Sequence, residues 1–156
     1  LFFFFFRYLG DCPFPALPFE NKDPIGDVMD IFSREQTKST PWIHFDPESH
    51  HLQIKGESYP ENSAKFYTPM LEWLEEYLTS QAPSRVRVDI ELIYFNSSSS
   101  KVFMNFFDRL EEAAQKGSQV EVNWMYHEEN ETAQECGEEF QEDLESVSFS
   151  LIPIEE

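Results

Sequence analysis

The chain has 156 residues, of which 30 are Asp or Glu and 11 are Lys or Arg, so its formal net charge is −19 at pH 7. This is the length of one domain, and a 40% share of hydrophobic residues is enough for a core, which excludes a wholly disordered acidic chain. The negative charge excludes binding to nucleic acid or to an anionic membrane surface, because their phosphate groups would be repelled.

The first 28 residues differ from the rest, because they hold seven of the 16 Phe and four of the ten Pro. Their longest apolar run has six residues, which is too short to span a membrane and lacks the charged start of a secretory signal. We therefore expect residues 1–36 to form an irregular leader and residues 37–156 to form the domain. Because Met29 is the first methionine, we also expect the residues upstream of it not to be native; the alternative is that the Phe run packs as an edge strand.

Cys12 and Cys136 are the only cysteines, and their separation fits no metal or redox motif. Two reduced thiols are typical of a cytoplasmic protein, so we expect that location. A hairpin could bring together His44, His50, His51 and Asp46, but nothing in the sequence fixes their geometry. We interpret the histidines as ordinary surface residues and expect neither a metal nor a cofactor.

Short β-favouring runs at 42–45 and 52–55, joined by turn residues at 46–49, predict a hairpin. The residues at 59–63 then break the strand, and Asn62 or Ser63 can cap a helix that we expect to reach about residue 80. This helix carries two apolar stripes, namely Phe66, Met70, Trp73 and Tyr77, and Tyr67, Leu71, Leu74 and Leu78. A double stripe indicates either a well-buried helix or one whose apolar face is partly open to a partner.

Residues 85–95 form the clearest expected strand, and apolar residues follow Leu92 on both of its faces. We therefore expect its C-terminal end to lie in the centre of the sheet. A serine-rich loop comes next, followed by the remaining expected elements: a helix built on Phe103, Phe106, Phe107, Leu110 and Ala114, a strand at 120–126, an acidic helix at 131–144 and a strand at 147–154. The order β-β-α-β-α-β-α-β predicts a single α/β domain with a mixed sheet of about five strands and helices mainly on one face.

The serine-rich loop, Asn96–Ser99, follows a central strand and precedes a helix. In such sheets the functional position lies at the C-terminal ends of central strands, where the next helix presents unpaired N–H groups. A phosphate on a serine there would add nearly two negative charges and could be held by backbone donors. The alternative is that the serines only cap the helix. No nucleotide loop, nucleophile elbow or His–acid pair accompanies them, so nothing indicates an enzyme.

Five runs between about residues 37 and 154 resemble the SiaC family of bacterial regulatory phosphoproteins in residue identity and in spacing: Ser39–Pro41, Gly56–Ser63, Tyr94–Lys101, Val122–Trp124 and Gly137–Phe140. The resemblance implies a small STAS-like domain, similar to anti-sigma-factor antagonists, that acts as a non-enzymatic binding switch. It implies one hydroxyl residue that a dedicated Ser/Thr kinase phosphorylates and a PP2C-type phosphatase dephosphorylates. In the family's best-understood branch, the unphosphorylated form binds and activates a diguanylate cyclase, which raises cyclic di-GMP and favours aggregation or biofilm growth.

The position that matches the family's phosphosite, usually Thr in an Asn-Thr-Ser-Ser pattern, is Ser97, and Ser98 is a competitor. We expect partner contacts from the loop and from the turn before the first helix, that is from Asn96, Ser98, Ser99, Lys101, Tyr59, Glu61 and Asn62. His127 and Asn130 stand where the family tends to be more acidic. Three alternatives stay open: a constitutive adaptor, an anti-sigma-antagonist-like partner-switching protein with another output, and an enzyme that acts on a small cationic or metal-bound substrate in an acidic cleft.

Overall fold

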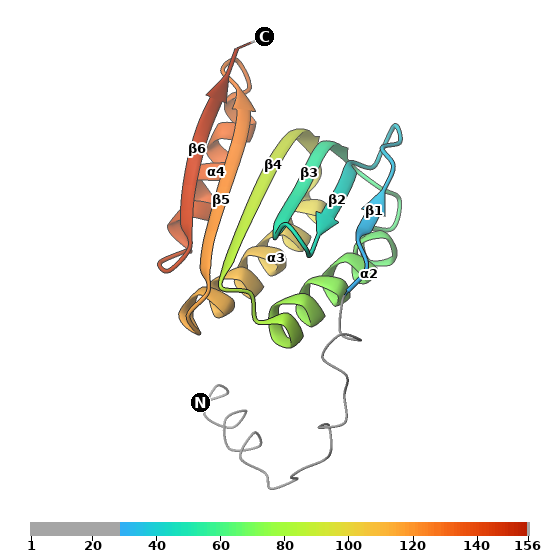
Figure 1. Cartoon of the computed structure of the whole chain (residues 1–156). Helices are drawn as coiled ribbons and strands as arrows, with labels where there is room; N and C mark the ends of the chain where they lie inside the picture. Colours follow the sequence, from blue (N-terminus) through green and yellow to red (C-terminus); the bar gives the residue numbers. More distant parts are fainter. Residues whose placement is uncertain (1–28, 156) are drawn as a thin grey trace, which may run out of the picture.

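A six-stranded mixed sheet in the order β1-β2-β3-β4-β5-β6 organises the part of the chain that the computed structural model describes, residues 29–155 (Figure 1). The elements are β1 (Phe32–Arg34), β2 (Trp42–Asp46), β3 (His51–Ser58), α2 (Ser63–Glu76), a π-helical turn (Tyr77–Gln81), β4 (Arg85–Phe95), α3 (Ser97–Gln115), β5 (Gln119–His127), α4 (Glu131–Glu142) and β6 (Ser148–Ile154). The pairs β1–β2 and β2–β3 are antiparallel, and β3 to β6 are parallel. The expectations for residues 1–28, including Cys12, lie outside the described residues.

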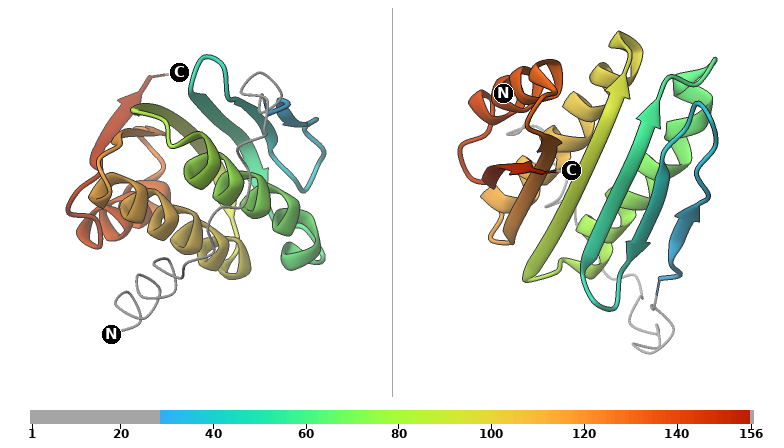
Figure 2. Two further views of the ribbon diagram at one scale, coloured as in Figure 1. Left: turned by 60° about the horizontal axis from the view of Figure 1, so that its bottom comes forward. Right: turned by 90° about the horizontal axis from the view of Figure 1, so that it is seen from above.

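The predicted α/β order is confirmed, and the three helices cover one face of the sheet (Figure 2). The sheet has six strands instead of about five, because β1 also pairs with β2. The irregular conformation expected up to residue 36 is therefore wrong for Phe32–Arg34. The physical reason is packing: the Phe32 ring lies 6.0 Å from that of Phe45 and 6.5 Å from that of Trp73, and this burial outweighs the weak local β preference of three residues.

The core lies between the sheet and the helices. Its largest fully buried side chains are Trp124, Tyr67, Tyr77, Phe45, Phe103 and Phe106. Both stripes of α2 pack against this core, since Phe66, Leu71 and Trp73 are partly buried there and the remaining stripe residues are buried. Of the two interpretations of α2, the structure therefore favours the well-buried helix. No helix in residues 29–155 is long and apolar enough to cross a membrane.

The C-terminal end of β4 is the clearest departure from expectation. Its pairing with β5 stops at Glu91, after which β5 diverges from it (Figure 1). On the other side its register with β3 shifts, so that Leu92 and Tyr94 face consecutive β3 residues and Ile93 is the extra residue of a bulge. Ile93 and Tyr94 are 47% and 53% exposed. The expectation that β4 ends in the centre of the sheet is wrong, because β5 leaves this end and only β3 pairs with it, as far as Phe95.

Candidate functional site

The helices that follow the parallel strands β3, β4 and β5 all begin with an asparagine N-cap. The side-chain oxygens of Asn62, Asn96 and Asn130 accept hydrogen bonds from the N–H groups of Lys65, Ser99 and Ala133 at 3.0, 2.9 and 3.1 Å. Asparagine suits this position, because its short side chain satisfies an N–H group that has no partner within the helix. Several positive helix ends therefore gather at the C-terminal edge of the parallel strands.

Four serines, Ser97–Ser100, form the first turn of α3, so the expected loop at Asn96–Ser99 is wrong for the serines, because the Asn96 cap lets the helix begin at Ser97. The first three of these serines differ in exposure and in hydrogen bonding. Ser97 is exposed, and its hydroxyl has no hydrogen-bond partner in residues 29–155. Ser98 is also exposed, but its hydroxyl donates to Asn96 Oδ1 at 3.0 Å and lies 2.8 Å from Ser63 Oγ. Ser99 is completely buried. The difference arises because successive residues of an α-helix point about 100° apart.

Ser99 is anchored in a buried hydroxyl network. Its Oγ lies 2.7 Å from Ser58 Oγ and donates to the Ser58 carbonyl at 3.0 Å, and Ser58 Oγ contacts the hydroxyl of Tyr67. Burial raises the pKa of Tyr67 to about 12, although the Ser58 bond opposes the shift, so the phenol stays neutral near pH 7. The network joins the end of β3 to both helices. Sequence reasoning did not assign Ser58 or Tyr67 to the site; the available signal was a serine at an inward-facing β3 position.

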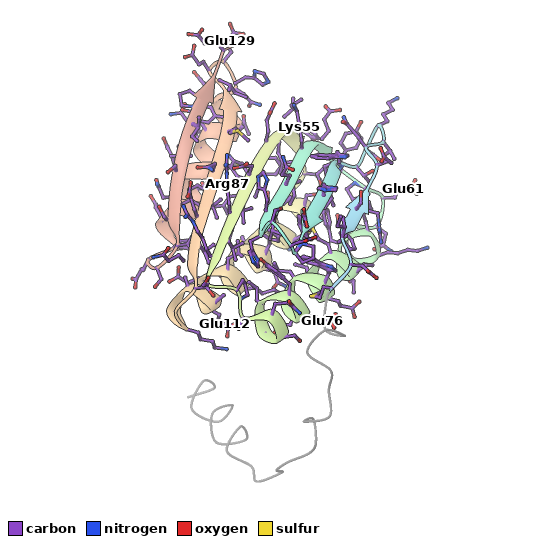
Figure 3. All side chains as sticks on the ribbon, viewed as in Figure 1. Lys55, Glu61, Glu76, Arg87, Glu112 and Glu129 are labelled. Atoms are coloured by element: carbon purple, nitrogen blue, oxygen red, sulfur yellow. The ribbon has the colours of Figure 1, made fainter. Side chains whose placement is uncertain are left out.

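Of the other predicted site residues, Tyr59 and Lys101 lie near the start of α3 and Glu61 does not. The rings of Tyr59 and Tyr94 pack in a T-shaped arrangement with centroids 5.6 Å apart, which places Tyr59 beside the strand end that leads into α3. Lys101 is exposed one turn after Ser97. Glu61 is exposed before α2 (Figure 3) and, within residues 29–155, makes no hydrogen bond or ion pair with the serines. The structure thus brings the β4 end and both helix starts together but leaves Glu61 outside this cluster.

His127 and Asn130 have structural contacts. Asn130 donates from Nδ2 to the carbonyl of Ile93 at 2.8 Å, so the residue that caps α4 also holds the end of β4. His127 Nε2 lies 3.6 Å from Glu91, and its Nδ1 is buried without a partner among the described residues.

The histidines near the first hairpin do not converge. His44 stacks on Trp42, His50 lies 2.6 Å from the hydroxyl of Tyr77, and His51 lies 2.7 Å from Asp89. Residues 29–155 contain no group of His, Cys, Asp or Glu side chains placed to hold a metal ion.

A polar network that sequence reasoning missed lies on the sheet face without helices, where Lys55 and Arg87 are labelled in Figure 3. Asp89 is only 8% exposed on this face, because Asn123, His51 and Arg87 surround it with bonds of 2.8, 2.7 and 3.3 Å. Burial alone would raise the pKa of Asp89, but the bonds from Asn123 and His51 and the charge of Arg87 together hold it below its usual value. The carboxyl is therefore ionised near neutral pH.

One open groove, of about 690 Å³, runs between α2 and α3 and is lined by Thr68, Leu71, Glu72, Glu75, Glu76, Thr79, Ser80, Asn105 and Arg109. Arg109 binds Glu75 at 2.8 Å, which leaves two unpaired carboxylates in the lining. The lining contains no His or Cys, so it has neither an imidazole to act as a general base nor a thiol to act as a nucleophile.

Comparisons with known proteins agree on one family. The profile described as SiaC family regulatory phosphoprotein matches residues 34–154. The chain is similar to apo-SiaC from Pseudomonas aeruginosa, with 36% identity and a TM-score of 0.74 over 80% of this chain and 99% of that one. It is equally similar (36%, TM-score 0.74, over 79% and 99%) to a chain of the complex of the diguanylate cyclase SiaD with its activator SiaC from that organism. An uncharacterised protein of P. aeruginosa strain UCBPP-PA14 is 42% identical over 116 residues, which are 74% of this chain and 90% of that protein.

Proposed function

The chain belongs to the SiaC family of regulatory phosphoproteins, and from this premise we propose that it is a phosphorylation-controlled switch whose unphosphorylated form binds and activates a diguanylate cyclase. In this proposal Ser97 is the phosphorylation site. A dedicated Ser/Thr kinase adds the phosphate, a PP2C-type phosphatase removes it, and the chain itself catalyses no reaction. The kinase consumes ATP, which agrees with the expected cytoplasmic location.

The observation that carries the proposal is the state of the Ser97 hydroxyl. Of the four serines at the start of α3, only Ser97 is both exposed and without a hydrogen-bond partner for its hydroxyl in residues 29–155, since Ser100 is half-buried. A kinase must place the attacking oxygen in line with the γ-phosphorus and remove its proton, so a hydroxyl without existing bonds reacts without first losing any. Ser98 and Ser99 would each have to give up two contacts.

The start of α3 can accommodate the added charge. A phosphoserine carries about −1.5 to −2 charges at pH 7 and three acceptor oxygens. At the first position of α3 it would face the positive end of the helix dipole, and Lys101 lies one turn further along. We therefore expect the phosphorylated chain to keep its fold and the phosphate to change only the surface that a partner meets.

We propose that the target docks on the surface formed by Ile93, Tyr94 and Tyr59 beside Ser97. Ile93 and Tyr94 are two of the few large apolar side chains that are exposed in residues 29–155, and Tyr59 packs on the Tyr94 ring. Exposed tyrosines are frequent centres of binding energy. A phosphate next to such a surface would have to lose water on docking without gaining a partner, so it opposes binding through charge as well as bulk.

Purified wild type, Ser97→Ala and Ser97→Asp, each incubated with the cognate kinase and ATP, test the proposal. Intact-mass measurement should show one added phosphate on the wild type and none on either variant. Cyclase binding should survive in Ser97→Ala and weaken in Ser97→Asp and in the phosphorylated wild type. Equal binding by all forms would instead indicate a constitutive adaptor, and a phosphate retained in Ser97→Ala would overturn the assignment of the site.

A further inference from the structure

Of the two exposed serines at the start of α3, only Ser98 forms hydrogen bonds through its hydroxyl within residues 29–155, one to Asn96 and one across to Ser63 of α2. Ser97 and Ser98 are neighbours of the same chemical type and are both exposed, so a kinase that reads the surrounding chain meets two similar acceptors. Ser98 differs by its contact with Ser63, whose Oγ lies 2.8 Å away in the first turn of α2. Ser63 is itself only 9% exposed.

The direction of this hydrogen bond follows from the proton count. A serine hydroxyl has one proton, and that of Ser98 is donated to Asn96 Oδ1 at 3.0 Å. The proton between the two serines must therefore come from Ser63, so Ser98 Oγ accepts from Ser63 while it donates to Asn96. Ser63 is held in place by the adjacent cap, in which Asn62 accepts from Lys65 N at 3.0 Å.

These bonds disfavour phosphoryl transfer to Ser98. In the transfer, a bond forms between the serine oxygen and the γ-phosphorus of ATP while the bond from that phosphorus to the bridging oxygen breaks. The hydroxyl proton passes to a carboxylate of the kinase, and ADP leaves. The proton donated by Ser63 occupies a lone pair of the Ser98 oxygen, and the Ser98 proton is committed to Asn96. Ser97 bears neither restraint.

We propose that Ser63 is a specificity-determining residue, which directs the kinase to Ser97 by engaging the hydroxyl of Ser98. The inference rests on the proposed function, in which a kinase modifies Ser97 at the start of α3. It adds a residue on another helix that no sequence motif connects with phosphorylation. A net hydrogen bond corresponds to a factor of about three to ten in an equilibrium, so removal of the Ser63 hydroxyl should raise modification of Ser98 by about that factor.

The test compares Ser97→Ala with the double variant Ser63→Ala/Ser97→Ala in the presence of the cognate kinase and ATP. Over a time course, we expect phosphate uptake at Ser98 in the double variant to be at least about three to ten times faster than any uptake by Ser97→Ala. Ser63→Thr/Ser97→Ala, which keeps a hydroxyl at position 63, should behave like Ser97→Ala. Circular dichroism confirms that the variants are folded.

The outcomes separate the two proposals. If the wild type takes up phosphate at Ser97 but the double variant takes it up no faster than Ser97→Ala, the role of Ser63 is refuted and the switch stands. Equal modification of the Thr-containing and Ala-containing double variants also refutes it. If the wild type takes up no phosphate, or takes it up only at Ser98, the proposed function of Ser97 fails and the role of Ser63 fails with it.

Discussion

Replacing Asn96 by Ala should destabilise the protein more than the same change at Asn62, although both residues cap a helix with one side-chain oxygen. Loss of an N-cap costs about 0.5–2 kcal/mol. At Asn62 the freed N–H belongs to the exposed Lys65, so water can replace the lost bond and about 1 kcal/mol is expected. At Asn96 the freed N–H belongs to Ser99, which is 0% exposed, and the Ser98 hydroxyl loses its acceptor as well. A buried donor without a partner costs about 1–3 kcal/mol, so we expect about 2 kcal/mol for Asn96→Ala.

Equilibrium unfolding in urea measures both variants. With a slope of about 2 kcal/mol per M, the midpoint should fall by about 1 M for Asn96→Ala and by about 0.5 M for Asn62→Ala. Asn96→Asp keeps an acceptor oxygen at the cap and should recover most of the loss. Equal midpoints for the two alanine variants, or a lower midpoint for Asn62→Ala, would refute the argument that burial of the Ser99 N–H makes Asn96→Ala the less stable variant.

The other predictions concern packing, pH and docking. Gly137→Ala would place a Cβ 2.6 Å from Trp124 Cδ1. Overpacking against this buried ring should lower the unfolding free energy by about 1–3 kcal/mol, partly offset by a helix-propensity gain of about 1 kcal/mol. A variant at least as stable as the wild type in thermal unfolding would contradict the close contact. Asp89 has a lowered pKa in the folded state, so it stabilises the fold above its unfolded pKa of about 3.9, and this contribution is lost as the pH falls through the lower folded value. The stability difference between wild type and Asp89→Asn should therefore shrink in urea unfolding below about pH 4, and a constant difference would argue against the network. Tyr94→Ala should weaken cyclase binding about tenfold or more in a titration, whereas Met104→Ala, which removes another exposed apolar side chain, should not; equal effects would exclude the proposed docking surface.

Periodicity and caps predicted the elements that depend on local sequence. The span 85–95 is the observed β4, and the helix expected after Asn62 begins at Ser63. These features are encoded within a few residues, through alternation in the strand and through a side chain that reaches the N–H three positions on.

The features that the sequence did not predict depend on distant partners. β1 forms because Phe32 packs against Phe45 and Trp73, both remote in the chain. The exposure of Tyr94 results from a bulge and from the divergence of β5. The serines of α3 are alike in sequence. They differ because the helix turns them in different directions, where Ser99 meets Ser58 of β3 and Ser98 meets Ser63 of α2.

The central claim is that the charge state of Ser97 controls binding to the cyclase. The most direct test titrates the cyclase with unmodified chain and with chain phosphorylated stoichiometrically at Ser97, and measures both affinity and cyclic di-GMP synthesis. We predict that the unmodified chain binds and activates, and that the phosphorylated chain binds about 100-fold more weakly, a difference of about 2.8 kcal/mol, and does not activate. Equal affinity and equal activation by the two forms would contradict the account.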